Sequence, residues 1–322
     1  MRSPPKLPPG CDPDSILLSF PVVREQAGQR LDRFLQACIP RLSRTRANAI
    51  VRNCAYRETG VRRRPSDRVR YGETVIIVRP PMNEPDVSTA FGVLYEDEHI
   101  LVVDKPAGLP VHPSASYHKK TLTYALRERY GDPAPQIAHR LDRETSGIVV
   151  CGRTLEAERV LKRLFEEREM DKRYVAIVHG AMPDDRGRID LSMGPASEGL
   201  HVKMEVREDG LHAVTDYEVL ERKAGASWVA LFPETGRQHQ LRVHLSAIGH
   251  PIVGCKLYGP EGDQPFLDYI DEGMTPELEA RLGHPRHALH AAGLVLPHPI
   301  TGETLRLEAP VPDDLTALWA RL

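Results

Sequence analysis

Beyond residue 90 the chain is dominated by short β-rich runs, and this succession constrains its fold more than any other feature. Five of these runs, bounded by glycine or proline, read HILVVDKP, GIVVCG, RYVAIVHG, SWVALFP and AGLVLPHP. Short apolar runs between turn-forming residues are typical of buried strands. Strands outnumber helical patterns and do not alternate with them, so we expect an α+β domain with a mixed, largely antiparallel sheet.

Three amphipathic patterns predict helices. The stretch GQRLDRFLQACIP has apolar residues at i, i+3, i+4 and i+7, which predicts a helix that stops at Pro40. A second helix is expected after Ser43, whose hydroxyl suits an N-cap, and a long third helix after Thr154. GETVIIVRPP predicts a buried strand. Residues 259–287 lack strand character, and we expect a short helix there in a surface excursion.

Proline-rich stretches divide the chain. RPPMNEPD suits a linker between two domains, because prolines stop both helices and strands. The N-terminal MRSPPKLPPGCDPD has no apolar core of the signal-peptide kind, and we expect it to be disordered. The expected organisation is a leader over residues 1–15, a small domain over 16–80, a linker over 81–89 and a larger domain over 90–322.

Charge is distributed unevenly along the chain. The net charge is −2, yet residues 41–70 hold ten arginines and two acidic residues, a net of +8 that leaves −10 for the remainder. Such a basic patch is typical of phosphate-backbone binding, with a solvated charged face as the alternative. Cations in the first turn of a helix oppose its dipole, which indicates a role with a ligand. We expect contacts with a nucleic-acid phosphate backbone from Arg44, Arg46, Arg62, Arg63 and Arg64.

Several classes of protein are excluded by composition and spacing. No apolar run approaches the ~18–20 residues that span a bilayer. The five cysteines are odd in number and far apart, which favours free thiols in a reducing cytoplasm over disulfides. Neither a phosphate-binding P-loop nor a dinucleotide glycine fingerprint occurs. Because they have no carboxylate or cysteine partners at ligand spacing, no metal is expected at His284, His287, His290 and His298.

The stretch IAHRLDRETSGIVV, from Ile137 to Val150, places a carboxylate between two guanidiniums directly before a predicted strand. A short loop that feeds a buried strand presents a side chain rigidly at the edge of a cleft. Arg140 and Asp142, two residues apart, share a face in an extended chain. Taken alone, the pair fits a surface salt bridge equally well.

HRLDRETSGIVV is similar to the signature of the RluA-type pseudouridine synthases, a His-Arg-Leu-Asp loop followed by Thr-Ser-Gly. Four further stretches resemble the other blocks of this family, in the same order. They are VLYEDEHILVVDKPAGLPVHP, KRYVAIVHG, PETGRQHQLRVHLSAIGHPIVG and RHALHAAGLVLPHP. The resemblance covers residues 90 to 312, approximately, and five ordered blocks make it specific.

This resemblance implies an isomerase that converts uridine to pseudouridine in RNA, without cofactor or metal. In the family the glycosidic bond breaks, the uracil turns and a carbon–carbon bond forms, with one ionised aspartate as the catalytic group. That position is Asp142, whether it attacks the ribose or removes a sugar proton. The resemblance also implies Arg242 as its charge partner, Tyr174 as a base-packing residue and candidate proton acceptor, and Arg140 as an RNA contact.

The N-terminal segment resembles the small RNA-binding module of the ribosomal protein S-four type, which many family members carry. Two departures stand out. CAYRETGVRRRPSDRVRYGE replaces the usual short hairpin, and Cys255 stands where family members typically have aspartate after HPIVG.

Large-subunit ribosomal RNA is the expected substrate, with transfer RNA as the alternative. A non-catalytic RNA-binding or ribosome-assembly protein is the rival from another class. The joint presence of Asp142, Tyr174 and Arg242 favours the enzyme, since a binding protein has no need of all three. The resemblance suggests a cytoplasmic monomer.

Overall fold

The chain forms two compact units. One comprises Met1–Pro85 with Ser116–His118, and the other Asp86–Ala115 with Lys119–Leu322. This division after Pro85 falls inside the stretch predicted as a linker.

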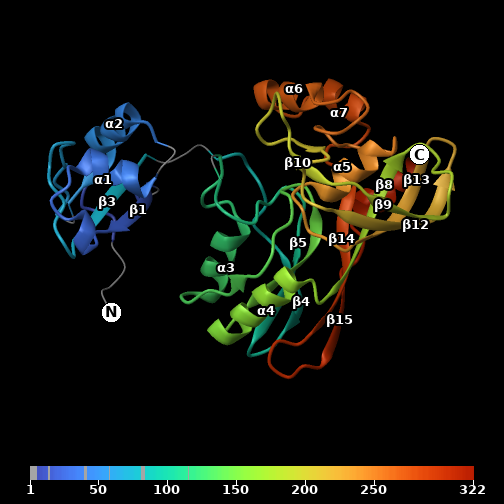
Figure 1. Ribbon diagram of the computed structural model, residues 1–322, viewed down its shortest axis with the longest axis horizontal. Helices are drawn as coiled ribbons and strands as arrows, with labels where there is room; N and C mark the ends of the chain where they lie inside the picture. The colour runs from blue at the N-terminus through green and yellow to red at the C-terminus, as the bar shows by residue number, and fades with distance from the viewer. Residues whose placement is uncertain (1–5, 14, 40–41, 58, 81–83, 115) are drawn as a thin grey trace. The chain divides into compact units, whose positions relative to one another are not determined.

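A computed structural model describes residues 6–13, 15–39, 42–57, 59–80, 84–114 and 116–322 (Figure 1). Parts of the predicted leader, residues 1–5 and 14, and of the predicted linker, residues 81–83, lie outside the described residues. Within the described residues, no helix is long and apolar enough to cross a membrane.

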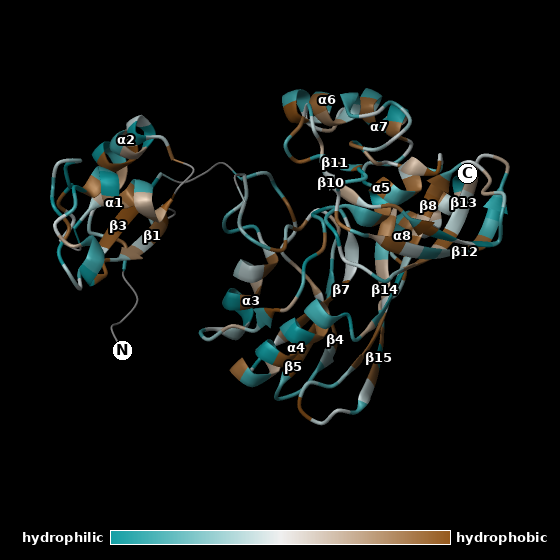
Figure 2. Cartoon of the chain, in the orientation of Figure 1, coloured by the Kyte–Doolittle hydropathy of each residue, from teal (hydrophilic) through white to brown (hydrophobic). Residues whose placement is uncertain are grey.

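The N-terminal unit is built on a three-stranded antiparallel sheet in the order β1-β3-β2. Leu31, Phe34 and Leu35 of α1 are fully buried and share one hydrophobic core with Val75 and Ile77 of β3, which is largely brown in Figure 2. Its elements are β1 (Ile16–Pro21), η1 (Arg24–Gln26), α1 (Leu31–Cys38), α2 (Arg44–Cys54), β2 (Ala55–Tyr56) and β3 (Thr74–Arg79).

Both helices predicted in this unit are confirmed, and so is the strand. Ser43 caps α2, because its hydroxyl accepts a hydrogen bond from the backbone N–H of Arg46 at 3.2 Å. The first turn of α2 holds no acidic residue, so its two arginines oppose the helix dipole. Pro40, the predicted stop of α1, lies outside the described residues.

The C-terminal unit is organised around one ten-stranded sheet. Its main path runs β4-β5-β7-β14-β8-β13-β12-β9, with β6 on β7 and β15 on β14. The strands are β4 (Gly92–Glu96), β5 (Ile100–Lys105), β6 (Gln136–Ile137), β7 (Ser146–Gly152), β8 (Asp171–His179), β9 (Arg186–Asp190), β12 (Val214–Lys223), β13 (Ala226–Pro233), β14 (Leu289–Pro297) and β15 (Thr304–Glu308). β14, which comes near the end of the sequence, thus lies between β7 and β8 in the sheet.

Pairing in this sheet confirms the expected α+β class. β14 runs parallel to β7, and the other pairings among the described strands of the sheet are antiparallel. The five predicted β-runs correspond to β5, β7, β8, β13 and β14. A separate small hairpin, β10 (Met193–Pro195) with β11 (Met204–Val206), was not expected from the sequence.

Helices cover both faces of the part of the sheet that contains β5 and β7. Ile100 and Val102 of β5 share a core with α4 (Leu155–Glu167), whereas Leu101 and Val103 share another with α3 (Leu122–Tyr130). Burial of both faces explains why this strand is apolar throughout instead of alternating. The predicted cap of α4 is present, since the Thr154 hydroxyl accepts from the Ala157 N–H at 3.2 Å.

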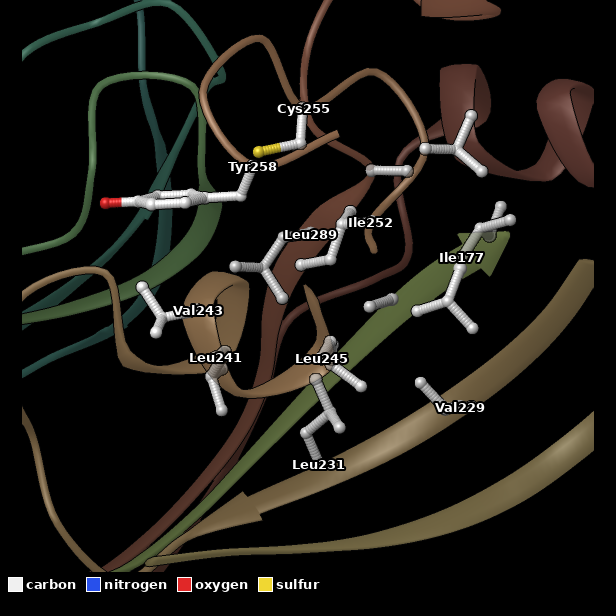
Figure 3. Close-up of a cluster of buried hydrophobic side chains, with 14 of the residues drawn as sticks. Ile177, Val229, Leu231, Leu241, Val243, Leu245, Ile252, Cys255, Tyr258 and Leu289 are labelled. Carbon is white, nitrogen blue, oxygen red and sulfur yellow. The ribbon is translucent and has the colours of Figure 1, made fainter. Parts of the chain in front are cut away.

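A third core fills the other end of the C-terminal unit. It joins β8 and β13 to α5 (Gln240–Ala247), α8 (Asp313–Arg321) and the turn over residues 252–258. Figure 3 shows apolar side chains of α5, β13 and this turn converging on Leu289 of β14. The excursion over 259–287 carries two helices where one was expected, α6 (Gln264–Glu272) and α7 (Pro276–Leu282).

Candidate active site

The loop before β7, residues 138–145, is fixed at its start by His139. Its Nε2 accepts a hydrogen bond from the Val150 N–H at 3.1 Å, and its ring stacks on Phe165 with centroids 4.2 Å apart. Burial lowers the pKa of His139 to about 3, so the imidazole is neutral and free to accept. His139, the first residue of the HRLD motif, therefore has a structural role: it holds the start of the loop in place.

Lys105 fixes the same loop from β5. Its side chain is fully buried, and its Nζ donates to the carbonyls of Pro106 and Leu109 at 2.9 Å and of Arg143 at 3.1 Å. Burial, with the nearby Arg286 charge, lowers the pKa of Lys105 to about 7. The lysine therefore ties the backbone next to Asp142 to the central sheet.

The end of the loop is held by β14 and by the residues before it. The Thr145 hydroxyl lies 2.8 Å from His287 Nε2, and the Ser146 hydroxyl 3.0 Å from His290 Nδ1. Gly147 has φ +109°, and a Cβ there would lie 2.2 Å from the carbonyl oxygen of Ala291. Only glycine fits this approach of the two strands. The Thr-Ser-Gly part of the motif thus docks the loop on β14.

The neighbouring charges in the motif do not bind Asp142. Arg143 donates to Glu144 at 3.0 Å and to the Tyr269 hydroxyl at 3.2 Å. Glu144 also accepts from Lys256 Nζ at 2.9 Å. Arg140 is exposed. Among the hydrogen bonds and ion pairs between described residues, neither arginine that flanks the aspartate in sequence is its partner.

Asp142 pairs with Arg242, one hundred residues away. Arg242 Nη1 donates to Asp142 Oδ2 at 2.9 Å, and the two side chains are 9% and 23% exposed. His239 Nε2 lies 3.8 Å from the other carboxylate oxygen. The pairing of Asp142 with Arg242, expected from the resemblance, is present in the structure.

Arg242 comes from α5, which is anchored at its first residue by a buried glutamine. Gln240 accepts from the Thr235 hydroxyl at 2.7 Å and the Arg237 N–H at 3.0 Å, and its amide donates to the Val214 carbonyl at 2.9 Å. His239 precedes it with φ +58°, a left-handed conformation that is strained for a histidine. Tertiary contacts thus fix where α5 begins.

Electrostatics keep Asp142 ionised. Burial alone would raise the pKa of Asp142, but the Arg242 charge and hydrogen bond, together with the charges of His239 and Arg140, outweigh burial, and this pKa lies below its ordinary value. Burial lowers the pKa of His239 to about 4 despite the nearby carboxylate, so this ring is neutral near pH 7. Arg242 is therefore the group that neutralises the carboxylate under ordinary conditions.

A cavity of about 290 Å³ opens beside this pair. Asp142, Arg242 and Tyr174, which lies on β8, line it together with Phe165 and Leu289. Burial, and then the Asp142 charge, raises the pKa of Tyr174 to about 12, so its hydroxyl stays protonated. Three cations also line the cavity, namely Arg140, Lys172 and Arg237. An anionic ligand with a flat apolar part suits such walls.

The predicted site residues fall into two groups. Asp142, Tyr174, Arg242 and Arg140 all line the one cavity. The five arginines predicted to bind RNA lie in the N-terminal unit, and four of them, Arg44, Arg46, Arg62 and Arg64, are exposed.

Arg63 is a correction to the expected basic surface. It is 4% exposed, and its guanidinium donates to Glu73 at 3.2 Å and to the Arg68 carbonyl at 3.3 Å. The interior of the small unit holds this arginine because its charge is paired there. Arg41, another arginine of the segment, lies outside the described residues.

Some residues of the cavity were missed from the sequence. Lys172 was not singled out, and its place two residues before Tyr174 on β8 was the available signal, since i and i+2 face one way on a strand. Cys255, which stands where family members typically have aspartate, contacts Arg242. The four histidines considered for a metal bind hydroxyls or carboxylates, and the described residues hold no cluster of three metal-ligating side chains.

Comparison with known proteins identifies the class. A family model described as RNA pseudouridylate synthase matches residues 99–247. The solved structure of Human RNA Pseudouridylate Synthase Domain Containing 1 superposes with a TM-score of 0.58 at 30% identity, over 73% of this chain and 90% of that one. The protein is thus an RNA pseudouridine synthase, an isomerase that converts uridine to pseudouridine.

Sequence relatives narrow the class to a family. Ribosomal large subunit pseudouridine synthase D of Xanthomonas campestris pv. campestris is 38% identical over 96% of this chain and 93% of the relative. The protein of the same name from Pseudomonas aeruginosa is 36% identical over 95% of each chain. The chain belongs to the RluA-type family of RNA pseudouridine synthases, as its ordered blocks indicated.

Proposed function

We propose that this enzyme isomerises uridine in large-subunit ribosomal RNA and that Asp142 is its catalytic carboxylate. The observation that carries the second part is the buried Arg242–Asp142 ion pair on the wall of the cavity. The first part rests on the relatives, which are named for large-subunit ribosomal RNA.

The proposed chemistry needs a carboxylate that stays charged after a base has excluded water from it. The guanidinium of Arg242 supplies that condition, because it lowers the pKa of Asp142 against the effect of burial. An ionised Asp142 is equipped for either proposed step, attack on the anomeric carbon or removal of a sugar proton.

Tyr174 is proposed to pack on the uracil that enters the cavity. Tyr174 lines the same cavity as Asp142, and aromatic side chains stack on bases regardless of sequence. With a pKa of about 12, its phenol is a weak proton acceptor unless it passes its own proton on in the same step. Base packing is therefore its principal proposed role.

A uridine in paired RNA reaches this cavity only after leaving the stack, at a cost of a few kcal/mol. Arg140 is exposed at the cavity and is proposed to contact the RNA there. Lys172 and Arg237 are placed to meet phosphates of the displaced strand. In the N-terminal unit, Arg44, Arg46, Arg62 and Arg64 are proposed to bind the RNA backbone.

The proposal places the enzyme in the cytoplasm as a monomer. A single chain supplies Asp142, Tyr174 and Arg242 to the cavity, so the proposed site needs no second copy.

Asp142→Asn tests the catalytic role. The substitution is nearly isosteric and removes the charge, so we expect pseudouridine formation to fall by at least ~10³-fold while RNA affinity persists. Asp209→Asn is the matched control, because Asp209 is an exposed aspartate paired with Arg207 at 2.8 Å. Turnover in Asp142→Asn equal to that of the control would refute the assignment.

The substrate is tested by mapping pseudouridines in total RNA from a strain that lacks the protein. Loss of a position in large-subunit ribosomal RNA, restored by the wild-type gene and not by Asp142→Asn, is the expected result. Loss confined to transfer RNA would replace the proposed substrate. An unchanged map would favour the non-catalytic alternative.

A further inference from the structure

The guanidinium of Arg242 is held on two edges by different groups. Its Nη1 donates to Asp142 Oδ2 at 2.9 Å, whereas its Nε and Nη2 both lie 3.5 Å from the sulfur of Cys255. This sulfur is buried, with 1% of the residue exposed. The ring of Tyr258 lies beneath the guanidinium, with its centroid 5.0 Å from Cζ. Two edges and one face of the cation are therefore occupied.

Cys255 and Tyr258 come from one turn, which Figure 3 shows beside α5. Gly254 anchors that turn with φ +76°, at a position where a Cβ would lie 2.0 Å from the Arg286 carbonyl oxygen. The Tyr258 hydroxyl lies 2.7 Å from His239 Nδ1, and Lys256 binds Glu144. Successive residues of the turn thus contact both halves of the site.

We propose that Cys255 is a positioning residue for the Asp142–Arg242 pair. Its sulfur accepts the Nε and Nη2 hydrogens, which fixes the rotation of the guanidinium and directs Nη1 at the carboxylate. This inference rests on the catalytic role proposed above for Asp142.

The choice of sulfur has an electrostatic consequence. A carboxylate at position 255, the residue typical of the family, would hold the same two donors by a bidentate bond. It would also share the charge of Arg242 and place a second carboxylate close to Asp142, and like charges at short range raise a carboxyl pKa. With cysteine, the sulfur holds the guanidinium in place without adding a second carboxylate beside Asp142.

The site contains other groups whose charge matters to the titration of Asp142. His239 is neutral near pH 7, and Tyr174 and Tyr258 both have pKa values of about 12. The charged and titratable groups around the pair include Arg140, Lys105, Glu144, Lys256, His287, His239, Tyr174, Tyr258, Lys172 and Arg237. All of them are retained in the variants below, so a change in the pH profile reports on position 255.

The test compares Cys255→Ala, Cys255→Ser and Cys255→Asp by steady-state kinetics across the acid range. Cys255→Ala frees one edge of Arg242, so we expect kcat to fall by about tenfold with KM changed less than about twofold. The acid limb of kcat should move up by about one pH unit, because a displaced guanidinium stabilises the carboxylate less. Cys255→Ser keeps an acceptor and should recover much of kcat.

Cys255→Asp separates geometry from charge. Its carboxylate should hold Arg242 in place, so the plateau of kcat is expected to stay within about threefold of wild type. The acid limb should still move up, because of the added negative charge.

Cys151→Ala is the matched control, since Cys151 is also fully buried but packs in the core of β5 and β7, away from Arg242. It should lower thermal stability and leave the acid limb unmoved. An unshifted limb in both Cys255→Ala and Cys255→Asp, or a kcat loss in Cys255→Ala no different from that of Cys151→Ala, would overturn the proposal. If Cys255→Ala does not fold, the limb of Cys255→Asp decides alone.

This outcome is distinguishable from failure of the proposed function. A catalytically active Asp142→Asn variant would refute the catalytic role of Asp142, and the positioning role of Cys255 with it. If Asp142→Asn is inactive but the Cys255 variants keep the wild-type kcat and acid limb, only the positioning role of Cys255 is refuted.

Discussion

Three arginines near Asp142 have three different environments, and the differences depend on which partners tertiary structure supplies. Arg143 is occupied by Glu144 and Tyr269, Arg140 is exposed at the cavity, and Arg242 binds the carboxylate. The sequence alone left a surface salt bridge open, because a one-dimensional pattern does not show how a loop rotates. The family resemblance, and no local rule, predicted the distant partner.

Tyr174→Phe tests the role of the Tyr174 hydroxyl. The ring and its packing remain, so KM is expected to change less than about threefold, while kcat falls by about 10–100-fold if the hydroxyl passes a proton. The measurement is single-turnover pseudouridine formation. Tyr217→Phe on β12 serves as control, because this partly buried tyrosine is not among the cavity residues. A wild-type rate in Tyr174→Phe would leave the residue with base packing alone.

At the scale of elements, the five apolar strands, β3 and the amphipathic helices α1, α2 and α4 were predicted, whereas several other elements, α5 among them, were not. α4 carries a polar cap and an apolar stripe, both visible in the sequence. α5 is only eight residues long, and its buried residues from Gln240 to Leu245 alternate between polar and apolar, so the sequence shows a period of two instead of a helical period. Its start is set by the hydrogen bonds of Gln240 to distant strands, which a local pattern does not contain.

The junction of β7 and β14 yields an element-scale prediction. Gly147→Ala combines a left-handed φ of +109° with a Cβ 2.2 Å from the Ala291 carbonyl oxygen, and that atom belongs to the backbone. We expect a loss of more than about 3 kcal/mol in unfolding free energy, or no folded protein. Gly225→Ala is the control, since nothing lies within 4 Å of the added atom. Urea unfolding curves of the two variants that coincide would contradict this account of the junction.

At the scale of the whole molecule, the net charge was a poor indicator of the expected RNA-binding surface, and the distribution of charge along the chain was a better one. The N-terminal unit carries the arginine-rich segment, and a chain average of −2 conceals it. What the sequence did not reveal was that one of these arginines is interior. Arg63 and Arg62 are adjacent and chemically identical, and only the fold separates them.

This separation gives a paired prediction. The double variant Arg62→Ala, Arg64→Ala should weaken RNA binding and lower the slope of log Kd against log salt by about one to two, with stability unchanged. Arg63→Ala should instead cost about 1–3 kcal/mol of stability in the N-terminal unit, because Glu73 loses its partner. Filter binding across a salt series and thermal unfolding measure the two effects. An unaltered salt slope in the double variant would mean that this surface is merely solvated.

The position of β14 has a consequence for how the enzyme is made. A ribosome synthesises Asp142, Tyr174 and Arg242 well before residues 289–297, yet β14 is the strand that joins β7 to β8. Until it is inserted, no strand-to-strand hydrogen bonds link β7 and β8, and the two halves of the sheet are not joined through its ladder. A chain that ends before residue 289 would therefore contain the three side chains proposed for catalysis without the strand that sets the two halves of the sheet side by side.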